Sequence, residues 1–340
     1  MKKVIDCTFF GHEEAGSKKL SLSTSIFTTD ILNAFARRGK ADSFTLLVNY
    51  NHEYFFRERF PQYKLCILSF FPITIFHKIT CGKFKGTKYL KKLGIFKRKA
   101  EECLFDAIWF SYCADCTYVK TKIPSICTIH DIYRVHRGGK GGWNFITDEN
   151  CMLTTVSNYT KNDIIKTFAL DEKHASSITK IPNSIVFDVS KQSKIVDLAG
   201  KNYILDLNAY IDKKNPMTLF KAFNMIKDKI EEDLVFCGGY KDKAIFSEMQ
   251  DFITQNGLTD RIEILFRVSD EERNYFLAHA TLFVTPSIFE DFGRTPVEAA
   301  IYKIPVISTK ETSPYEATLG LCNYIDDTKQ ECCSHFCKAA

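Results

Sequence analysis

Two glutamates, Glu290 and Glu298, stand eight residues apart in the stretch of the chain that most favours chemistry. Residues 280–286 before them are apolar and β-branched and end in a proline, which predicts a short buried strand. Gly293 lies between the two glutamates and lets backbone approach a ligand closely. Two carboxylates and a glycine turn therefore follow the carboxyl end of a strand, where open α/β sheets bind ligands.

A helix is predicted to begin directly after this loop. Thr295 suits the N-cap position, Pro296 the first helical position and Glu298 the third, from which a carboxylate reaches back to the cap amide. A helix N-terminus also attracts anions. On these residues alone two interpretations stay open. Either Glu298 only completes a capping box and Glu290 is a solvated loop residue, or both face a ligand.

The stretch from Ser287 to Ser308 resembles the E-x7-E motif of the retaining glycosyltransferases of family 4. The likeness includes Phe-Gly after the first glutamate, Pro-Val-Glu-Ala-Ala around the second and Pro-Val-Ile on the next strand. The resemblance implies the GT-B architecture, an α/β fold of two facing Rossmann-like domains with a cleft between them. It also implies that Glu290 binds donor-sugar hydroxyls, that Glu298 binds the nucleotide ribose, and that the donor site includes Phe292, Gly293 and Arg294.

The second domain, residues 201–322, is predicted from alternating strands and helices. Asn215 as N-cap and Pro216 predict the start of a helix with a buried stripe formed by Leu219, Phe220, Phe223, Ile226 and Ile230. Lys213 and Lys214 precede it and favour an anion site, although two exposed loop lysines remain an alternative. The resemblance matches Lys214 to a lysine that binds the donor diphosphate. Its partner arginine falls on Ala209, so Lys213 or Arg294 would have to replace it.

Further donor-binding positions follow from the resemblance. Gly238 and Gly239 form a glycine turn after a predicted strand, and Arg267 and Val268 border the nucleotide base. Residues 269–272, Ser-Asp-Glu-Glu, predict a second capping box at the start of a helix.

The first domain is predicted to span residues 1–188, with a polar linker over 189–200 and a tail over 323–340. A helix is predicted to end at Arg37-Arg38-Gly39, because cations and then glycine mark a helix C-terminus. The glycine-rich loop of the family lies near Gly16, which we take as an acceptor-side residue.

His130 and Asp131 follow a short apolar strand, residues 125–129, and so stand at its carboxyl end. A lone histidine is usually structural, but this position beside a carboxylate favours a role in a site. The resemblance implies that His130 projects towards the donor sugar and is catalytic together with Glu290, and Asp131 is assigned to the acceptor side. The glycine-rich segment 137–142 is a candidate for a moving acceptor loop.

Composition excludes several classes of protein. The chain has 340 residues, which suits two domains, and a net charge of +5, which makes no demand for nucleic acid. Its thirteen cysteines are an odd count without a recognisable signal peptide, so we expect reduced thiols and a cytoplasmic protein. Cys113 and Cys116 form a C-x-x-C without a second pair at zinc spacing, and no metal site is predicted.

A basic run extends from Lys83 to Lys99, with eight cations, no acid and interleaved aromatic and aliphatic residues. Most such runs are solvated faces. The interleaving also suits peripheral contact with an anionic membrane at its inner face.

The sequence therefore predicts a retaining glycosyltransferase that moves a hexose from a UDP- or GDP-linked sugar to a glycan or lipid-linked acceptor, as in polysaccharide or glycolipid synthesis. No cofactor and no metal are expected, because no D-x-D occurs in the chain and Lys214 would meet the charge of the diphosphate. The rival interpretations are another GT-B enzyme, such as a hydrolysing sugar-nucleotide epimerase, and a non-catalytic nucleotide-binding module.

Overall fold

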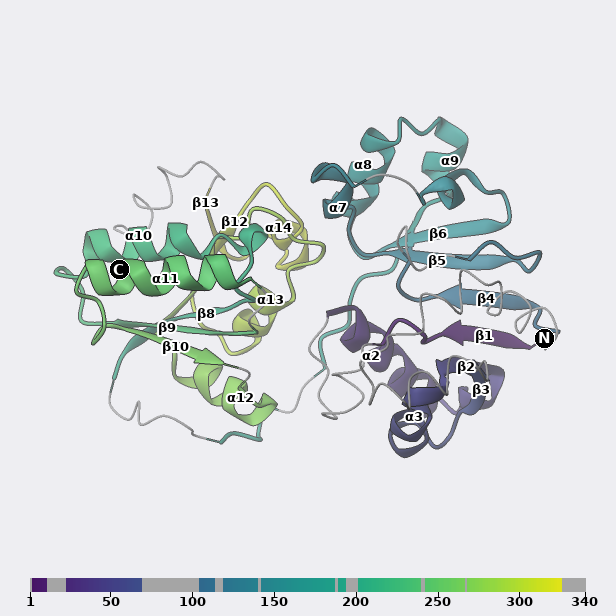
Figure 1. Cartoon of the computed structure of the whole chain (residues 1–340), viewed down its shortest axis with the longest axis horizontal. Helices are drawn as coiled ribbons and strands as arrows, with labels where there is room; N and C mark the ends of the chain where they lie inside the picture. Colours follow the sequence, from purple (N-terminus) through teal and green to yellow (C-terminus); the bar gives the residue numbers. More distant parts are fainter. Residues whose placement is uncertain are drawn as a thin grey trace. The chain divides into compact units, whose positions relative to one another are not determined.

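The computed structural model describes residues 2–10, 23–68, 104–113, 119–139, 142–186, 189–193, 201–239, 242–266 and 268–325. Gly16, Arg267 and the basic run from Lys83 to Lys99 lie outside these ranges, as do Cys116 and the tail beyond residue 325. The chain divides into two compact units, Met1–Val156 with Thr160–Ser184 and Ser157–Tyr159 with Ile185–Ala340. Each unit is an α/β domain built on one parallel sheet (Figure 1).

Seven parallel strands form the N-terminal sheet in the described residues, in the order β3-β2-β1-β4-β5-β6-β7. The strands are β1 (Lys3–Asp6), β2 (Phe44–Asn49), β3 (Lys64–Leu68), β4 (Ala107–Phe110), β5 (Ser125–Ile129), β6 (Cys151–Thr155) and β7 (Thr179–Lys180). The helices are α2 (Ser23–Arg37), α3 (Glu53–Arg59), α7 (Tyr133–His136), α8 (Asn158–Thr167) and α9 (Glu172–Ser177), with short 3-10 turns η1 (Ala41–Ser43), η2 (Tyr50–His52) and η3 (Asn144–Thr147).

Six parallel strands form the C-terminal sheet of the described chain, in the order β10-β9-β8-β11-β12-β13. They are β8 (Tyr203–Leu207), β9 (Asp233–Gly238), β10 (Ile262–Phe266), β11 (Leu282–Thr285), β12 (Val306–Thr309) and β13 (Asn323–Ile325). The helical segments are η4 (Asp212–Lys214), α10 (Pro216–Ile226), α11 (Lys243–Gln255), α12 (Asp270–His279), α13 (Arg294–Ile301) and α14 (Pro314–Ala317).

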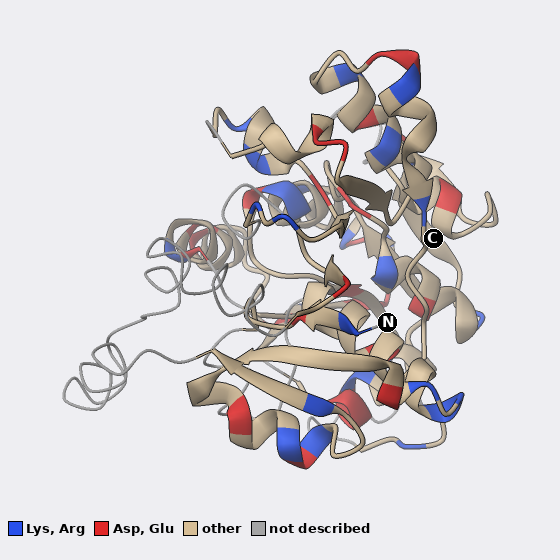
Figure 2. Ribbon diagram, turned by 90° about the vertical axis from the view of Figure 1, so that its right-hand side faces the viewer, with Lys and Arg blue, Asp and Glu red and all other residues tan. Residues whose placement is uncertain are grey.

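Both sheets are buried on both faces, as parallel sheets are when helices cover each side. Along β8, Ile204 packs with α10 and α11, whereas its neighbour Leu205 packs with α12 and α13 on the opposite face. Along β1, Val4 and Ile5 likewise point into two different cores. Charged residues are consequently scarce on the strands and gather on helices and loops (Figure 2).

Several predicted helix ends are confirmed. Helix α2 ends at Arg37, and Gly39 follows in the left-handed conformation with φ +64°. Ser269 caps α12, and the reciprocal bonds between Ser269 and Glu272 form the predicted capping box. Helix α10 begins at Pro216 after Asn215, and its predicted apolar stripe is buried from Leu219 to Ile226. The prediction was wrong for Ile230, which lies beyond the end of the helix and is only partly buried against the same core.

No helix in the described part of the chain has the length and apolar character that crossing a bilayer requires. The expected peripheral contact through Lys83 to Lys99 falls outside the described residues and stays a prediction.

Candidate functional site

The C-terminal sheet reverses its direction of growth between β8 and β11. The chain moves outward from β8 through β9 to β10 and then returns to the other side of β8 at β11. Asn208 follows β8 and donates a hydrogen bond from Nδ2 to Oγ1 of Thr285, the last residue of β11, over 3.1 Å. The carboxyl ends of these two strands are therefore joined at the switch point, the place where open α/β sheets bind ligands.

Lys214 and Glu290 meet at this point. Lys214 ends η4, which follows β8, and Glu290 lies on the loop that leaves β11. The ammonium group of Lys214 donates to Oε1 of Glu290, and the two side chains are 16% and 5% exposed. The two loops are also joined through their backbones, since Ile288 N donates to Lys213 O over 2.9 Å. The predicted phosphate-binding lysine and sugar-binding glutamate thus form one nearly buried ion pair.

Hydrogen bonds from residues at and after the end of β12 hold the backbone of the Glu290 loop. Ser313 donates from Oγ to the carbonyl oxygen of Glu290 over 2.8 Å, and Thr309 donates from Oγ1 to the carbonyl oxygen of Ser287 over 2.7 Å. Both donors follow or end β12. The carboxylate therefore stands on a fixed loop, which is the condition for a precise binding geometry.

Gly293 makes the turn from this loop into α13. Its φ of +82° lies in the left-handed region, and a Cβ atom there would lie 2.8 Å from Cγ of Pro314. Both the conformation and the close contact require glycine. The close packing at Gly293 is against Pro314 of the protein itself, and the predicted approach of backbone to a ligand stays a prediction.

The predicted start of α13 was wrong. The helix begins at Arg294 with Gly293 as its N-cap, so Thr295 caps nothing and Pro296 is the third helical residue. Proline is tolerated there because the first amides of a helix lack intrahelical partners in any case. Glu298 accepts a hydrogen bond from Nε of Arg294 over 2.8 Å and is 3% exposed. An ion pair, and not a capping box, holds its carboxylate.

A third carboxyl group interacts electrostatically with both members of the ion pair. Asp206 of β8 is fully buried, and its Oδ1 accepts a hydrogen bond from Asn208 over 2.7 Å. Burial raises the pKa of Asp206 to about 8; the Asn208 bond and Lys214 oppose this, and Glu290 adds to it. In the described residues no hydrogen-bond partner reaches Oδ2. Asp206 is therefore a neutral acid below about pH 8.

The other predicted donor positions are placed as follows. Gly238 ends β9, where a Cβ atom would lie 1.8 Å from the carbonyl oxygen of Asn208, so the chains approach too closely for any side chain. The carbonyl of Gly239 accepts from Tyr210 N over 3.2 Å. Phe292 is buried in the loop after Glu290, and Val268 packs against the core on the α12 side of the sheet.

Ala209 stands where the family has an arginine, and Lys213 and Arg294 are the two predicted replacements for that cation. Lys213 places its Nζ 5.8 Å from the centroid of the Phe289 ring, a cation–π geometry. Arg294 is paired with Glu298. Lys213 directly precedes Lys214 in η4, and Arg294 is the first residue of α13, four positions after Glu290. Which of the two replaces the arginine stays a prediction.

His130 follows β5 in the N-terminal sheet, as predicted, and is 2% exposed. Its Nε2 lies 3.1 Å from the carbonyl oxygen of Ser111, which can only accept, so Nε2 carries the proton in the neutral ring. Phe27 packs edge-on against the imidazole with ring centroids 4.9 Å apart. Asp131 accepts from the amide of Tyr133, the first residue of α7, over 3.1 Å. Asp131 thus has a local structural role in addition to any role in binding.

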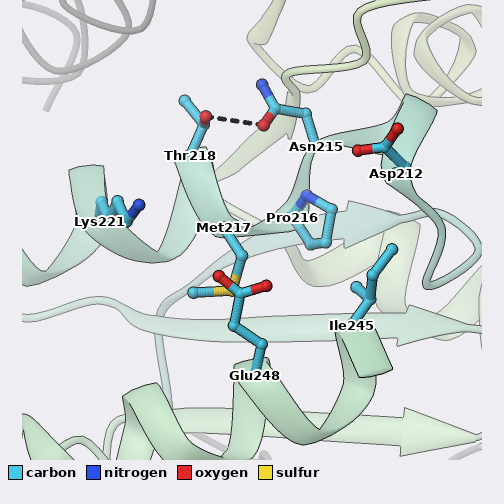
Figure 3. A pocket seen from close by; sticks show the side chains of 8 residues that line it. All are labelled: Asp212, Asn215, Pro216, Met217, Thr218, Lys221, Ile245 and Glu248. Carbon is cyan, nitrogen blue, oxygen red and sulfur yellow. Dashed lines mark hydrogen bonds between the residues drawn. The ribbon is translucent and has the colours of Figure 1, made fainter. Parts of the chain in front are cut away.

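A separate hollow lies between the start of α10 and α11 (Figure 3). Its volume is about 240 Å³, and Asp212, Asn215, Pro216, Met217, Thr218, Lys221, Ile245 and Glu248 line it. Thr218 donates to Oδ1 of Asn215 across 2.8 Å, as the figure shows. Neither Lys214 nor Glu290 lines this hollow, so it is distinct from the ion-pair site.

Comparison with protein families supports a domain assignment for the second unit. Residues 188–320 match the family described as "Glycosyl transferases group 1". The match includes the whole ion-pair site, from Asp206 to Ser313. This part of the chain is therefore similar to the glycosyltransferases of group 1.

Curated relatives extend the comparison. The chain is 26% identical over 200 residues to the α-1,3/1,6-mannosyltransferase ALG2 of Dictyostelium discoideum. The aligned region covers 49% of this chain and 48% of the relative. It is 31% identical over 155 residues to the O-antigen chain mannosyltransferase RfbU of Salmonella typhimurium, covering 46% and 41%. The chain thus spans about half of these relatives' length or less.

Solved structures resemble the whole fold. The glycosyltransferase WaaG aligns over all of this chain and 90% of its own, with a TM-score of 0.68 and 11% identity. The Anabaena protein HepE, solved with UDP and glucose, aligns over 98% and 88%, with a TM-score of 0.66 and 14% identity. The predicted fold class of two Rossmann-like domains is confirmed.

Sequence reasoning missed part of the site. Asp206 was not predicted as a site residue because it lies inside an otherwise apolar strand. A single carboxyl group in such a strand is itself a sign of a functional position, since charged residues are rarely buried there. Thr285, Ser287 and Ser313 were likewise unremarked. Each is a small polar residue at the carboxyl end of a buried strand or just after it, which marks the ligand edge of a parallel sheet.

Proposed function

We propose that this protein is a retaining, metal-independent glycosyltransferase that uses a nucleotide-diphosphate hexose as donor and a glycan or lipid-linked saccharide as acceptor. The observation that carries the proposal is the ion pair of Lys214 with Glu290 at the switch point of the C-terminal sheet, one turn before the N-terminus of α13. This edge offers a cation, a carboxylate and helix amides within one small region.

The charges of this region suit a donor with an anionic diphosphate and a neutral sugar. Lys214 donates to a phosphate oxygen, and Glu290, released from the pair, accepts hydrogen bonds from sugar hydroxyls. Glu298 is positioned by Arg294 on the first turn of α13 and accepts from the ribose. The ion pair therefore keeps both charged groups satisfied until the donor arrives, since an unpaired buried charge is costly.

The proposed chemical step follows from this placement. The bond from the anomeric carbon to the diphosphate oxygen breaks, and a bond to the acceptor oxygen forms on the same face. The acceptor proton passes to the departing diphosphate. Lys214 and the N-terminus of α13 meet the negative charge that develops on the leaving group. His130 supports placement of the sugar from the N-terminal domain.

The hexose is proposed as mannose in the first instance, because ALG2 and RfbU are described as mannosyltransferases. Glucose is the second choice, because HepE was solved with UDP and glucose. A role in polysaccharide or glycolipid synthesis is part of the proposal, and the description of RfbU as an O-antigen chain mannosyltransferase supports it.

A thermal-shift panel with UDP, GDP, ADP and their hexose conjugates tests the donor, because a ligand that binds the native state raises the melting temperature. The expected result is a shift with one diphosphate and its sugar, preserved in EDTA. A second assay follows release of the free diphosphate with and without saccharide acceptors. Acceptor-dependent release supports a transferase, whereas acceptor-independent release identifies a hydrolysing enzyme.

Ala209 supports a second candidate, a nucleotide-binding module without turnover. This position lacks the cation that the family places beside the lysine, and loss of one transition-state donor lowers rates by about 10²–10³. A shift with diphosphate but no release under any acceptor is the outcome that this candidate predicts.

A further inference from the structure

Asn208 joins three neighbouring strands of the C-terminal sheet at their carboxyl ends. Its backbone amide donates to the carbonyl oxygen of Cys237 in β9 over 3.1 Å. Its side-chain amide donates to Oδ1 of Asp206 in β8 over 2.7 Å and to Oγ1 of Thr285 in β11 over 3.1 Å. Both hydrogens of the side-chain amide are therefore used. Asp206 thus fixes the orientation of the amide that connects β8 with β11.

The connection continues into the loop that carries Glu290. Oγ1 of Thr285 lies 3.1 Å from Oγ of Ser287, and the carbonyl oxygen of Ser287 accepts from Thr309 over 2.7 Å. The side chains of this network, from Asp206 to Thr309, are at most 4% exposed. A buried polar network of this kind holds its members in one arrangement. A change at Asp206 therefore reaches the loop of Glu290.

The hydrogen bonds of Asp206 assign a proton to its carboxyl group. Oδ1 accepts from Asn208, whereas in the described part of the chain no partner reaches Oδ2 and no cation forms a salt bridge with either oxygen. Lys214, the cation that interacts with Asp206, donates to Glu290 instead. A fully buried carboxylate with one unbonded oxygen is far more costly than the neutral acid. The raised pKa of Asp206 agrees with this geometry.

The titratable groups that interact with Asp206 come from four places in the domain. Lys214 lies in η4, Glu290 in the loop after β11, Tyr210 after β8 and Cys237 in β9. Burial raises the pKa of Tyr210 and of Cys237 above their ordinary values, so both stay neutral from about pH 6 to about pH 8. Ionisation of Asp206 would thus place a second negative charge near a single ammonium group.

We propose that Asp206 is a positioning residue of the donor site, and that its carboxyl group must carry a proton for the site to bind a diphosphate with full affinity. The inference rests on the proposed function. With the proton in place, the donor phosphates compete with Glu290 for the ammonium group of Lys214. Without it two carboxylates attract that ammonium group, and the additional buried charge repels the phosphates. Donor binding is therefore linked to proton uptake above about pH 8.

Titration calorimetry on the full chain tests this linkage, with UDP, GDP, ADP and inorganic pyrophosphate as probes. The Kd of the wild type should rise about five- to tenfold between pH 7 and pH 9. Asp206→Asn keeps the shape of the acid and an acceptor oxygen for Asn208, but it has no proton to lose, so this rise should disappear. Asp251→Asn is the matched control, because Asp251 is an exposed residue of α11. It should follow the wild type.

The wild type also tests the inference without any substitution. Calorimetry at pH 8.5 in two buffers of different ionisation enthalpy measures the protons exchanged on binding. We expect uptake of about half a proton or more per nucleoside diphosphate. Binding without proton uptake would overturn the proposal even if Asp206→Asn fails to fold. An equal rise of Kd with pH in the wild type and in Asp206→Asn would overturn it as well.

Pyrophosphate separates this inference from the proposed function. If no nucleotide binds, but pyrophosphate binds with a pH dependence that Asp206→Asn removes, the transferase proposal fails and the role of Asp206 at an anion site stands. If nucleotides bind and acceptor-dependent turnover proceeds, but the wild type and Asp206→Asn share one pH profile, the inference fails alone. If neither nucleotides nor pyrophosphate bind the wild type, both fail.

Discussion

Lys214 and Glu290 are 76 residues apart in the chain, yet they form a hydrogen-bonded ion pair that is largely withdrawn from solvent. Removing one partner of a buried pair leaves the other charge uncompensated, which costs about 3–5 kcal/mol in typical cases. Single substitutions at either residue therefore combine an effect on function with one on stability. The double variant Lys214→Met/Glu290→Gln removes both charges, so it leaves no unpaired charge. It is therefore the stability control for the single substitutions at this site.

Glu290→Gln retains shape and an amide oxygen for Lys214, but it removes a charged acceptor for sugar hydroxyls. Turnover should fall by at least ~10²-fold; the melting temperature should also fall, because Lys214 loses its charged partner, but the variant should stay folded. Steady-state release of the diphosphate and circular dichroism check the two parts. A variant that keeps most of the wild-type rate with a donor it binds would remove Glu290 from the site.

Lys214→Ala should weaken binding of the nucleoside diphosphate by about 1.5–3 kcal/mol, the range for a charged hydrogen bond, and leave the nucleoside nearly unaffected. Calorimetric titration with both ligands makes the comparison. Lys213→Ala is the matched control from the same turn. Equal losses for both ligands would assign Lys214 to the fold, and a larger effect of Lys213→Ala would assign the phosphate contact to its neighbour.

His130→Ala should lower kcat by about tenfold or more and change nucleotide affinity little, since the residue lies in the other domain. Because His130 is buried and bonded to Ser111, this variant should also lose stability. His130→Gln keeps a donor for the Ser111 carbonyl and separates the two effects. Full activity in His130→Gln would show that the imidazole is structural.

Asp206 predicts a pH dependence of stability. Burial raises its pKa from 3.8 to about 8, so the folded protein binds more protons than the unfolded chain between these values. Stability should therefore fall as pH rises from about 4 to about 8, by at most about 1.4 kcal/mol per unit from this group. Asp206→Asn should remove this slope. Melting temperatures from pH 5 to 9 test it: the variant's advantage should grow with pH and level off above 8, and a constant difference would contradict the assignment.

The segment Lys83 to Lys99 predicts salt-sensitive attachment to anionic membranes. Near such a surface each cation contributes about 1 kcal/mol. Sedimentation with anionic and neutral vesicles at low and high salt measures it. Replacing Lys88, Lys91, Lys92 and Lys97 with serine should abolish the anionic preference and spare nucleotide binding. Indifference of the wild type at low salt would make the run a solvated face.

Much of the fold could be predicted because local signals and burial agree. The glycine after α2, the Ser269–Glu272 box and the Asn215–Pro216 start of α10 each follow from the chemistry of helix ends. The start of α13 could not be predicted in this way. The contact of Gly293 with Pro314 sets that turn, and residues 21 positions apart leave no local sign of it.

The site was predicted in part. Spacing placed Lys214 and Glu290 at strand ends, but only the order of the strands shows that β8 and β11 are neighbours and that the two side chains meet. Asp206 depends on the same neighbourhood, since its elevated pKa comes from burial in the middle of the sheet. The order of the strands decides which residues are neighbours in a parallel sheet. The sequence around one residue does not reveal that order.

The contact between Gly293 and Pro314 also bears on how this sequence can diverge. Alanine at position 293 would meet both an unfavourable φ and the proline ring, so relieving one obstacle leaves the other. Shortening residue 314 cannot rescue a substitution at 293, because the φ of +82° and the Cα atom of residue 314 remain, whereas we expect glycine at 293 to accept several residues at 314. The dependence between the two positions is thus one-sided. In a saturation library, position 293 should remain glycine in every functional clone while position 314 varies among small residues.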